Sequence, residues 1–436
     1  MATPLPNDNN CNLRVIIAIT TVAESELTTT LAQTAQMLQD EANLAYQQSL
    51  VNFRMEIARI ARTSYTEVNT SGTDVSNFQA GVSPLNSIHT LREVYKGDVL
   101  VLLRKGDFQI GSSTLFGEAY DQPTTNDPPN ASEAFCMVTT DYLIGGRFTF
   151  AHEIGHLQGA GHDNNTESPN YARGFIQNNI IGPTRTIMAT ANVTGCSFNN
   201  SGCRVQYFSN PNVNFGTGPM GTVDRDNVRR MNETAPAILN YRSTSENLVV
   251  QNETFDNEIL ANHLGNSTVS TSGTVTASNG SWVTFRATDE ITLNPGFSAD
   301  NGSDFTAALI NNPCTVLPPQ DTTNVSAPST TIARTVTDES ADNRRDNTSI
   351  QESVRTYPNP SDNLLNIEFV LKKPAKVSLV ITDLAGKVEK GISKNANYES
   401  GVHKLTVNTE KLAPGVYIYT LVLDNNRHTG KIVIVH

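Results

Sequence analysis

Three histidines and a glutamate lie within one short stretch of the chain, HEIGHLQGAGH at 152–162. His152 and His156 are four residues apart, so on a helix their imidazoles lie on one face, one turn apart. Gly159 can adopt the left-handed conformation that ends a helix, which lets the chain turn back and bring His162 to the same point. The spacing therefore predicts a metal site with three histidine ligands.

Zinc binds imidazole nitrogen at about 2.0–2.1 Å, and its catalytic sites keep a position open for water. Bound zinc lowers the pKa of that water from 15.7 to about 7. Glu153 is not needed as a ligand, so it can accept a proton from this water and return it to a leaving amine. The pattern predicts one catalytic Zn2+ ion held by His152, His156 and His162. The predicted reaction is hydrolysis of peptide bonds through a zinc-bound water that Glu153 activates.

The elements around this motif predict an α/β domain. Strand-like and helix-like segments alternate before it, which favours a mostly parallel sheet with covering helices. A helix is expected to start after Ser25 as its N-cap and to end near Ser49. The helix carrying the zinc motif is expected to start near Gly146. The other segments are strands at 13–20, 51–57, 99–104, 115–120 and 134–139, and a helix at 85–95.

The remainder of the chain changes character several times. The segment 163–223 has little periodicity, and a helix at 224–241, kinked at Pro236, is expected to close a first domain at 1–244. The segment 245–315 predicts a small stacked β module, with Val275, Val283 and Ile291 recurring every eight residues. Residues 316–354 are polar and predict a disordered linker, and 355–436 predict a β-sandwich.

Charge and hydropathy exclude several classes of partner. The chain has 43 acidic and 31 basic residues, a net charge of −12, which argues against nucleic-acid binding. From Tyr357 onward, however, ten basic residues outnumber seven acidic ones, which suggests separate modules. No apolar run is long enough for a transmembrane segment. The start, MATPLPNDNN, is no signal peptide, so either the protein is cytosolic or its exported form begins there; the C-terminal segment favours export.

The five cysteines form no C-x-x-C pair, which makes a cysteine zinc site unlikely. Cys196 and Cys203 flank a polar segment that a short disulfide could close; the alternative is two free thiols. An exported protein favours the disulfide. Cys11, Cys136 and Cys314 allow at most one further bridge.

The stretch HEIGHLQGAGHD resembles the metzincin metallopeptidases, whose pattern is H-E-x-x-H-x-x-G-x-x-H, and Asp163 resembles their reprolysin (adamalysin-like) branch. The resemblance spans about 11–242 and implies a mixed, mostly parallel five-stranded sheet. It implies that the three histidines are ligands, that Glu153 is the general base, and that Met188 in TIMA is the methionine turn beneath the metal. It also implies an edge strand that holds the substrate, for which 115–120 is the candidate, and a pocket formed within 187–215. Calcium binding occurs in this family, but no dedicated calcium loop is recognisable.

The C-terminal segment resembles the type IX secretion sorting domain of Bacteroidetes. The shared features are YPNP at 357–360, ITDLAGKV at 381–388, LAPGVYIY at 412–419 and the terminal KIVIV. This resemblance implies contact with the type IX secretion machinery, export through the outer membrane, and a secreted or surface-attached product. The stretch NPGFSADNGSDFTAAL is similar to a small accessory module found beside such signals.

The sequence thus predicts a secreted zinc endopeptidase that acts on proteins or peptides. A non-catalytic surface adhesin or binding protein on the same fold is the alternative. It is disfavoured because neither a ligand nor Glu153 is lost. An inactive precursor latched by Cys11 is a further alternative, disfavoured because few residues precede the first strand.

Overall fold

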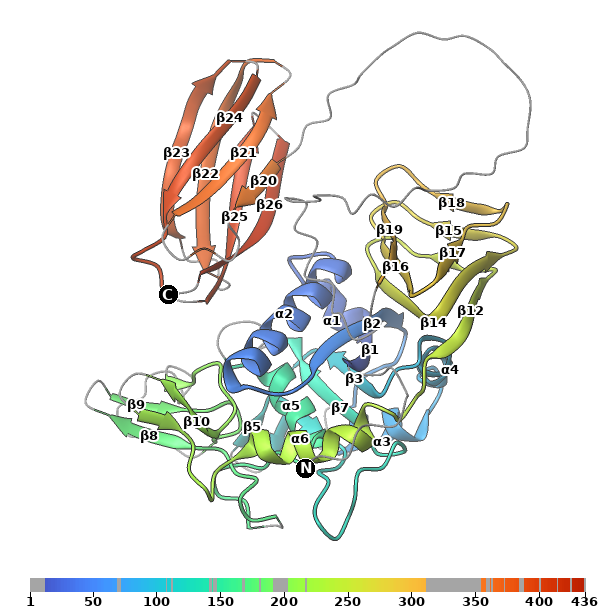
Figure 1. Ribbon diagram of the computed structural model, residues 1–436, viewed down its shortest axis with the longest axis vertical. Coiled ribbons are helices and arrows are strands. Elements are labelled where there is room, and N and C mark those ends of the chain that lie inside the picture. Colours follow the sequence, from blue (N-terminus) through green and yellow to red (C-terminus); the bar gives the residue numbers. More distant parts are fainter. Residues whose placement is uncertain are drawn as a thin grey trace. The chain divides into compact units, whose positions relative to one another are not determined.

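The computed structural model describes residues 12–310 and 354–434, which belong to two separate units, Met1–Leu317 and Pro318–His436 (Figure 1). Each unit is described by itself. The predicted linker at 316–354 lies outside the described residues except for its last position. The description leaves out the following short segments: 69–71, 107, 111–112, 141–142, 144–146, 167–168, 180–181, 191–202, 216–217, 358–360, 362–363, 372, 384–387, 400, 414 and 424–425.

A twisted sheet forms the centre of the first unit. Strand β1 (Asn12–Thr20) is apolar along most of its length and buried at every position, and it pairs in parallel with β2 (Arg54–Thr63) and β3 (Val99–Arg104). Strand β7 (Phe135–Thr139) extends the parallel part, and β6 (Gly117–Ala119) pairs antiparallel with β7 at the edge. The predicted mixed, mostly parallel character of the sheet is confirmed, but the predicted number of five strands is wrong for the whole sheet, because β2, β1, β3, β7 and β6 are part of a sheet of ten strands.

Two long helices lie where the sequence predicted them. Helix α2 (Leu31–Ser49) packs against β2, and α4 (Asn86–Tyr95) packs against β1. The predicted N-cap at Ser25 is wrong, because Ser25 ends a short helix, α1 (Thr21–Ser25). The cap of α2 is Thr30, whose hydroxyl accepts a hydrogen bond from the Gln33 N–H, while the Gln33 side-chain oxygen accepts one from the Thr30 N–H.

The helix that carries the zinc motif is α5 (Thr149–Leu157), and it lies against β6 and β7. It starts later than the predicted Gly146, because Phe148 has φ 54°, a left-handed conformation that a right-handed helix cannot contain. All of its residues except His156 are buried. The closing helix is α6 (Asn227–Ile238), which contains Pro236 near its end. No helix of the described part has the length and hydropathy needed to cross a bilayer.

The remaining elements of the peptidase-like part are short. Helix α3 (Thr73–Ala80) was not predicted and packs against β7. The segment 163–223, which lacks sequence periodicity, contains two antiparallel pairs, and a third precedes β6. These pairs are β8 (Ile176–Asn179) with β9 (Gly182–Arg185), β10 (Asn210–Phe215) with β11 (Gly218–Met220), and β4 (Phe108–Ile110) with β5 (Ser113–Leu115).

The stacked β module is a parallel solenoid. Leu260 pairs with Trp282, and Trp282 pairs with Asp304, so that each turn of the stack is 22 residues long. The predicted stacking is therefore present, but the eight-residue recurrence is not its repeat. It is the distance between successive strands of one turn, since Val275, Val283 and Ile291 lie on three different strands. The strands are β12 (Ser245–Gln251), β13 (Thr254–Phe255), β14 (Leu260–Ser272), β15 (Val275–Ala277), β16 (Trp282–Ala287), β17 (Glu290–Thr292), β18 (Phe297–Ala299) and β19 (Asp304–Leu309).

The solenoid continues the central sheet. Strand β14 pairs antiparallel with β2 at Ala261 and Arg59, so β14, β16 and β19 extend the sheet beyond β2 (Figure 1). Buried Glu56 on β2 forms ion pairs with Arg14 on β1, at 2.9 Å, and with Arg286 on β16. One hydrophobic core runs through both parts. The predicted boundary between 244 and 245 therefore separates two parts that share one hydrophobic core, and it stays a prediction.

The second unit consists entirely of antiparallel strands around a core of its own, as predicted. One sheet holds β20 (Val354–Tyr357), β21 (Leu364–Leu371) and β24 (Gly401–Asn408). The other has the order β23 (Val388–Tyr398), β22 (Ala375–Asp383), β25 (Gly415–Leu423) and β26 (Asn426–Ile434).

Candidate metal centre and its surroundings

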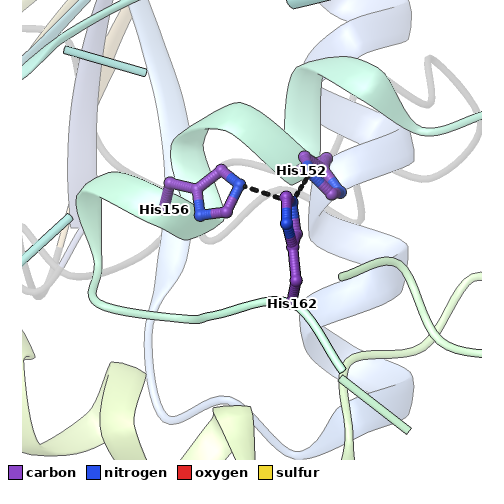
Figure 2. A group of neighbouring side chains, drawn as sticks. All are labelled: His152, His156 and His162. Carbon is purple, nitrogen blue, oxygen red and sulfur yellow. Dashed lines mark hydrogen bonds between the residues drawn. The ribbon is translucent and has the colours of Figure 1, made fainter. Parts of the chain in front are cut away.

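The three predicted ligands converge on one point. His152 and His156 project from the same face of α5, and His162 reaches them from the loop that follows (Figure 2). The Nε2 atom of His162 lies 3.1 Å from Nε2 of His152 and 3.0 Å from Nε2 of His156. Among the described residues this is the one group of three His, Cys, Asp or Glu side chains able to hold a metal ion.

The hydrogen bonds of these rings leave their Nε2 atoms free to bind a metal. Nδ1 of His152 lies 2.8 Å from the Ile187 carbonyl and Nδ1 of His156 lies 3.0 Å from the Ala160 carbonyl. A carbonyl can only accept, so each Nδ1 carries the proton and each Nε2 presents a lone pair. The single proton that a neutral His162 can place on Nε2 cannot satisfy both neighbours. The donor set therefore fits a cation at its centre.

The electrostatics of the site keep the rings neutral. Burial, reinforced by the neighbouring imidazoles, lowers the pKa of His156 to about 3 and that of His152 well below its ordinary range. Burial also lowers the pKa of His162. Neutral imidazole is the form that binds metals, so near pH 7 no proton must leave these rings before a metal ion binds.

The turn that delivers His162 is built on Gly159. Its φ is +82°, the predicted left-handed conformation, and its N–H donates to the His156 carbonyl at 2.7 Å. A Cβ at this position would lie 2.9 Å from the Pro123 carbonyl oxygen and 2.7 Å from Nε of Arg230. Both the conformation and the space therefore require glycine.

Glu153 lies between α5 and the edge strand β6. Its carboxylate accepts a hydrogen bond from the Ala119 N–H. A Cβ added to Gly117 would come within 2.6 Å of the Glu153 side chain, so the strand and the carboxylate are in direct contact. Burial, and secondarily the nearby Glu118 carboxylate, raises the pKa of Glu153 to about 8. A carboxyl with a pKa near neutrality can both accept and return a proton.

Met188 lies against the middle of the metal-binding helix. It is fully buried, and its Sδ lies 2.9 Å from where a Cβ on Gly155 would stand. The preceding residue, Ile187, supplies the carbonyl that fixes His152. Asp163, which follows the third histidine, accepts a hydrogen bond from the Thr190 N–H at 2.7 Å. The turn around Met188 is thus tied to His152 and to Asp163, the residue that follows the third histidine.

Sequence reasoning missed Arg204, which lies beside the metal centre. Its Nη1 donates to the Arg147 carbonyl at 2.6 Å and its Nη2 to the Ala189 carbonyl at 3.1 Å. Its positive charge contributes to the lowered pKa of His152 and offsets part of the rise in the pKa of Glu153. The sequence offers no pattern that places it there. Its only sign was its position within the 187–215 stretch expected to form a pocket.

The cysteine predictions are tested only in part. Cys203 is disulfide-bonded, while Cys196 lies outside the described residues, so the Cys196–Cys203 pairing stays a prediction. Cys136 is a buried free thiol in β7. Burial, and secondarily the Glu153 carboxylate, raises the pKa of this thiol well above its usual range, which makes it unreactive. Cys11 and Cys314 also lie outside the described residues.

Comparison with known protein families gives one match in the first half of the chain and one at its C-terminal part. Residues 7–209 match metallopeptidase family M12, in its reprolysin-like group. Residues 355–435 match the secretion system C-terminal sorting domain, which implies export through the outer membrane to the medium or the cell surface. These matches agree with the resemblances of the histidine motif and of the C-terminal strands.

Curated relatives cover the first half of the chain. A peptidyl-Asp metalloendopeptidase of Xanthomonas campestris pv. campestris is 32% identical over 236 residues, covering 53% of this chain and 52% of the relative. One of Pseudomonas fragi is 30% identical over 205 residues, covering 46% of this chain and 100% of the relative. The chain spans about half the length of the Xanthomonas relative. Metalloproteinase-II from Bacteroides fragilis is a more distant solved structure, with 19% identity and a TM-score of 0.27 over 37% of this chain and 46% of that one.

Proposed function

Since the chain belongs to metallopeptidase family M12, we propose that it is a zinc-dependent endopeptidase that hydrolyses peptide bonds in proteins outside the cell. The observation that carries the proposal is the arrangement of four side chains. Three imidazoles direct their Nε2 lone pairs to one point, and the Glu153 carboxylate is held on the same helix by the edge strand. His152, His156 and His162 are proposed as the ligands, and Met188 as the residue that supports them.

Zinc suits this site because it accepts three imidazole nitrogens and keeps a fourth position for water. A zinc ion held there supplies Lewis acidity, which polarises a carbonyl group and makes water acidic near neutral pH. Glu153 then accepts a proton from the attacking water and delivers it to the departing amine. No second group of possible metal ligands occurs among the described residues, so the proposal includes no calcium site.

The edge strand β6 is proposed to align the substrate. One side of β6 pairs with β7, and Gly117 and Ala119 lie beside the Glu153 carboxylate. An extended peptide can pair with such an edge through backbone hydrogen bonds, which hold many sequences alike. This arrangement suits an endopeptidase, because neither end of a substrate chain has to be recognised.

The names of the relatives suggest the residue next to which a substrate is cleaved. Four curated relatives match this chain, and each of them carries the name peptidyl-Asp metalloendopeptidase. We extend this preference to the present chain and propose that it cleaves proteins next to aspartyl residues. We further propose that the C-terminal unit engages the type IX secretion machinery, and that the peptidase acts as a released or surface-attached protein.

The test compares the wild type with Glu153→Gln and with Glu246→Gln, a change of an exposed carboxylate in the solenoid. Metal content is measured by elemental analysis, and cleavage of a denatured protein is followed with and without a chelator. Wild type and Glu246→Gln should contain zinc and cleave, and Glu153→Gln should contain zinc without cleaving. Binding of proteins by a zinc-loaded wild type that cleaves none of a broad panel would favour a binding protein instead.

A further inference from the structure

The edge strand β6 has two faces, and they meet different helices. On one face Gly117 contacts Glu153 of α5, since a Cβ on Gly117 would lie 2.6 Å from the side chain of that glutamate. Successive residues of a strand point to opposite faces, so the next residue, Glu118, points away from Glu153. Because β6 is only three residues long and can form few backbone hydrogen bonds, its side-chain contacts weigh heavily in its position.

Glu118 lies on the face that α3 covers. It pairs with Met137 of β7, and paired residues of neighbouring strands share a face of the sheet. Phe135, two residues before Met137, lies on the same face, and its ring packs edge-on against that of Phe78 in α3, with the ring centroids 5.4 Å apart. The half-buried side chain of Glu118 reaches the start of this helix, where its carboxylate accepts a hydrogen bond from the Gly72 N–H at 2.8 Å.

This hydrogen bond couples α3 to the edge strand. Gly72 is the N-cap residue of α3, and no side chain at the cap accepts a hydrogen bond from the first turn. The start of a helix carries free N–H groups and a partial positive charge, which a carboxylate stabilises. Glu118 brings a carboxylate to this helix start from a different element, so that the position of β6 is linked to that of α3.

The start of α3 is in turn anchored to the central sheet. Asp74, in the first turn, is fully buried and accepts hydrogen bonds from the Tyr65 hydroxyl at 2.7 Å and from the Val68 N–H at 2.8 Å. Nε of Arg104, at the end of β3, lies 3.4 Å from the Asp74 carboxylate. The helix start that holds Glu118 is therefore itself fixed by the central strands.

We propose that Glu118 is a positioning residue of the peptidase. Through its hydrogen bond to Gly72 it holds β6 against Glu153, and it thereby aligns both the base and the strand on which the substrate is proposed to pair. The inference rests on the proposed function and adds to it a residue on the opposite face of the strand from the base. Without this hydrogen bond β6 keeps its pairing with β7 but loses a link to α3, so the contact between Gly117 and Glu153 can shift.

The experiment measures kcat and KM of Glu118→Gln and Glu118→Ala on a peptide that extends well to both sides of the cleaved bond. The oxygen of a Gln side chain can still accept the Gly72 N–H, so Glu118→Gln should keep kcat/KM within a few-fold of the wild type. Alanine has no acceptor. In Glu118→Ala kcat/KM should fall by about 10- to 100-fold, as expected when a catalytic group is misplaced by up to about 1 Å. Most of this fall should appear in kcat, because the base acts in the chemical step.

Glu26→Gln and Glu26→Ala are the matched controls, because Glu26 is an exposed carboxylate that pairs with Lys105 at 2.6 Å. Both should leave kcat and KM unchanged. Zinc content and melting temperature are measured for every protein, and Glu118→Ala should keep its zinc. Glu118→Leu, which fills the space of the side chain without an acceptor, repeats the test if the alanine variant is unstable, and the same fall in kcat/KM is expected.

A kcat/KM within two-fold of the wild type in both Glu118→Ala and Glu118→Leu overturns the inference. An equal fall in Glu118→Gln and Glu118→Ala also overturns it, since the acceptor is then not what holds the strand. So does a fall that is matched by an equal loss of bound zinc, because the whole site is then lost. All of these results leave the endopeptidase proposal standing, whereas a zinc-loaded wild type that cleaves no peptide refutes that proposal itself.

Discussion

Gly117 and Glu153 are in contact: a Cβ on Gly117 would stand 2.6 Å from both Cγ and Oε1 of the glutamate. The two residues lie on different elements, β6 and α5. The same strand gives the Ala119 N–H to the Glu153 carboxylate. The edge strand therefore fixes the position of the proposed base as well as offering a surface for substrate.

Gly117→Ala should displace the Glu153 carboxylate, because the added methyl group occupies its place. A misplacement of about 1 Å in a catalytic group can lower the rate by about 100-fold, so a fall of this order in kcat/KM is expected. Zinc content should be unchanged, since Glu153 is not a ligand. Both quantities are measured on the same preparation. Full activity in this variant would show that the contact does not position the base.

Zinc should stabilise the chain, because the metal-free state holds three lone pairs close together without a cation. At a zinc concentration of 100 times its dissociation constant the gain is about 2.7 kcal/mol. The melting temperature of the metal-free protein should rise on addition of zinc. His162→Ala should remove most of this rise, and His403→Ala in the second unit should not. An equal rise in all three proteins would place the zinc elsewhere.

The residues of the metal site could be predicted from the sequence because they lie close together along the chain. His152, Glu153, His156 and His162 lie on one helix and its following turn, so spacing alone brings them together. The contacts of Glu153 with Gly117 and of Arg147 with Arg204 join segments that are tens of residues apart, and no pattern within either segment signals them.

The same distinction applies to the fold. Apolar strands such as β1 and β3 were predicted because burial on both faces gives a continuous apolar run. The 22-residue repeat of the solenoid was missed because stacked positions such as Leu260, Trp282 and Asp304 differ in chemical type. The cap at Thr30 was missed because Ser25 and Thr30 were compared by residue type alone, whereas only Thr30 is followed three residues later by a glutamine, Gln33, that completes a capping box.

Glu41 provides a test of stability against pH. Burial on α2 raises the pKa of this carboxyl from 4.5 to about 8, so the folded chain binds its proton more tightly than the unfolded chain. Its contribution to stability is therefore full below pH 4.5 and is lost as the pH rises toward 8. Relative to Glu41→Gln, the free energy of unfolding of the wild type should fall by about 1.4 kcal/mol per pH unit in that window.

This difference is measured by urea unfolding of both proteins at several pH values, with Glu246→Gln as the exposed control. Any constant cost of placing a buried amide at position 41 shifts the whole curve and leaves its slope unchanged. A difference that does not vary between pH 5 and 8 would mean that Glu41 ionises as easily in the folded chain as in the unfolded one.

Glu56 should be among the most sensitive positions outside the metal site. Glu56 is 4% exposed. Its carboxylate faces the guanidinium groups of Arg14, on β1 of the sheet, and of Arg286, on β16 of the solenoid. Glu56→Gln removes the carboxylate that both buried guanidinium groups share, so a loss of about 3–5 kcal/mol is expected. Glu93→Gln, which breaks the exposed pair with Arg242, should lose at most about 1 kcal/mol. Comparable losses from the two changes, again by urea unfolding, would show that the buried cluster does not join the two parts.

The solenoid touches the central sheet through few strands, and this has a consequence for its length. The pairing of Ala261 with Arg59 and the hydrogen bond from Asn262 to the Ile57 carbonyl both belong to β14. Strand β16 stacks on β14, and β19 stacks on β16, each offset by one 22-residue repeat. Whole turns can therefore be gained or lost at the far end while the junction stays as it is. Each turn gained or lost would therefore change the length of the module by one strand of the parallel stack.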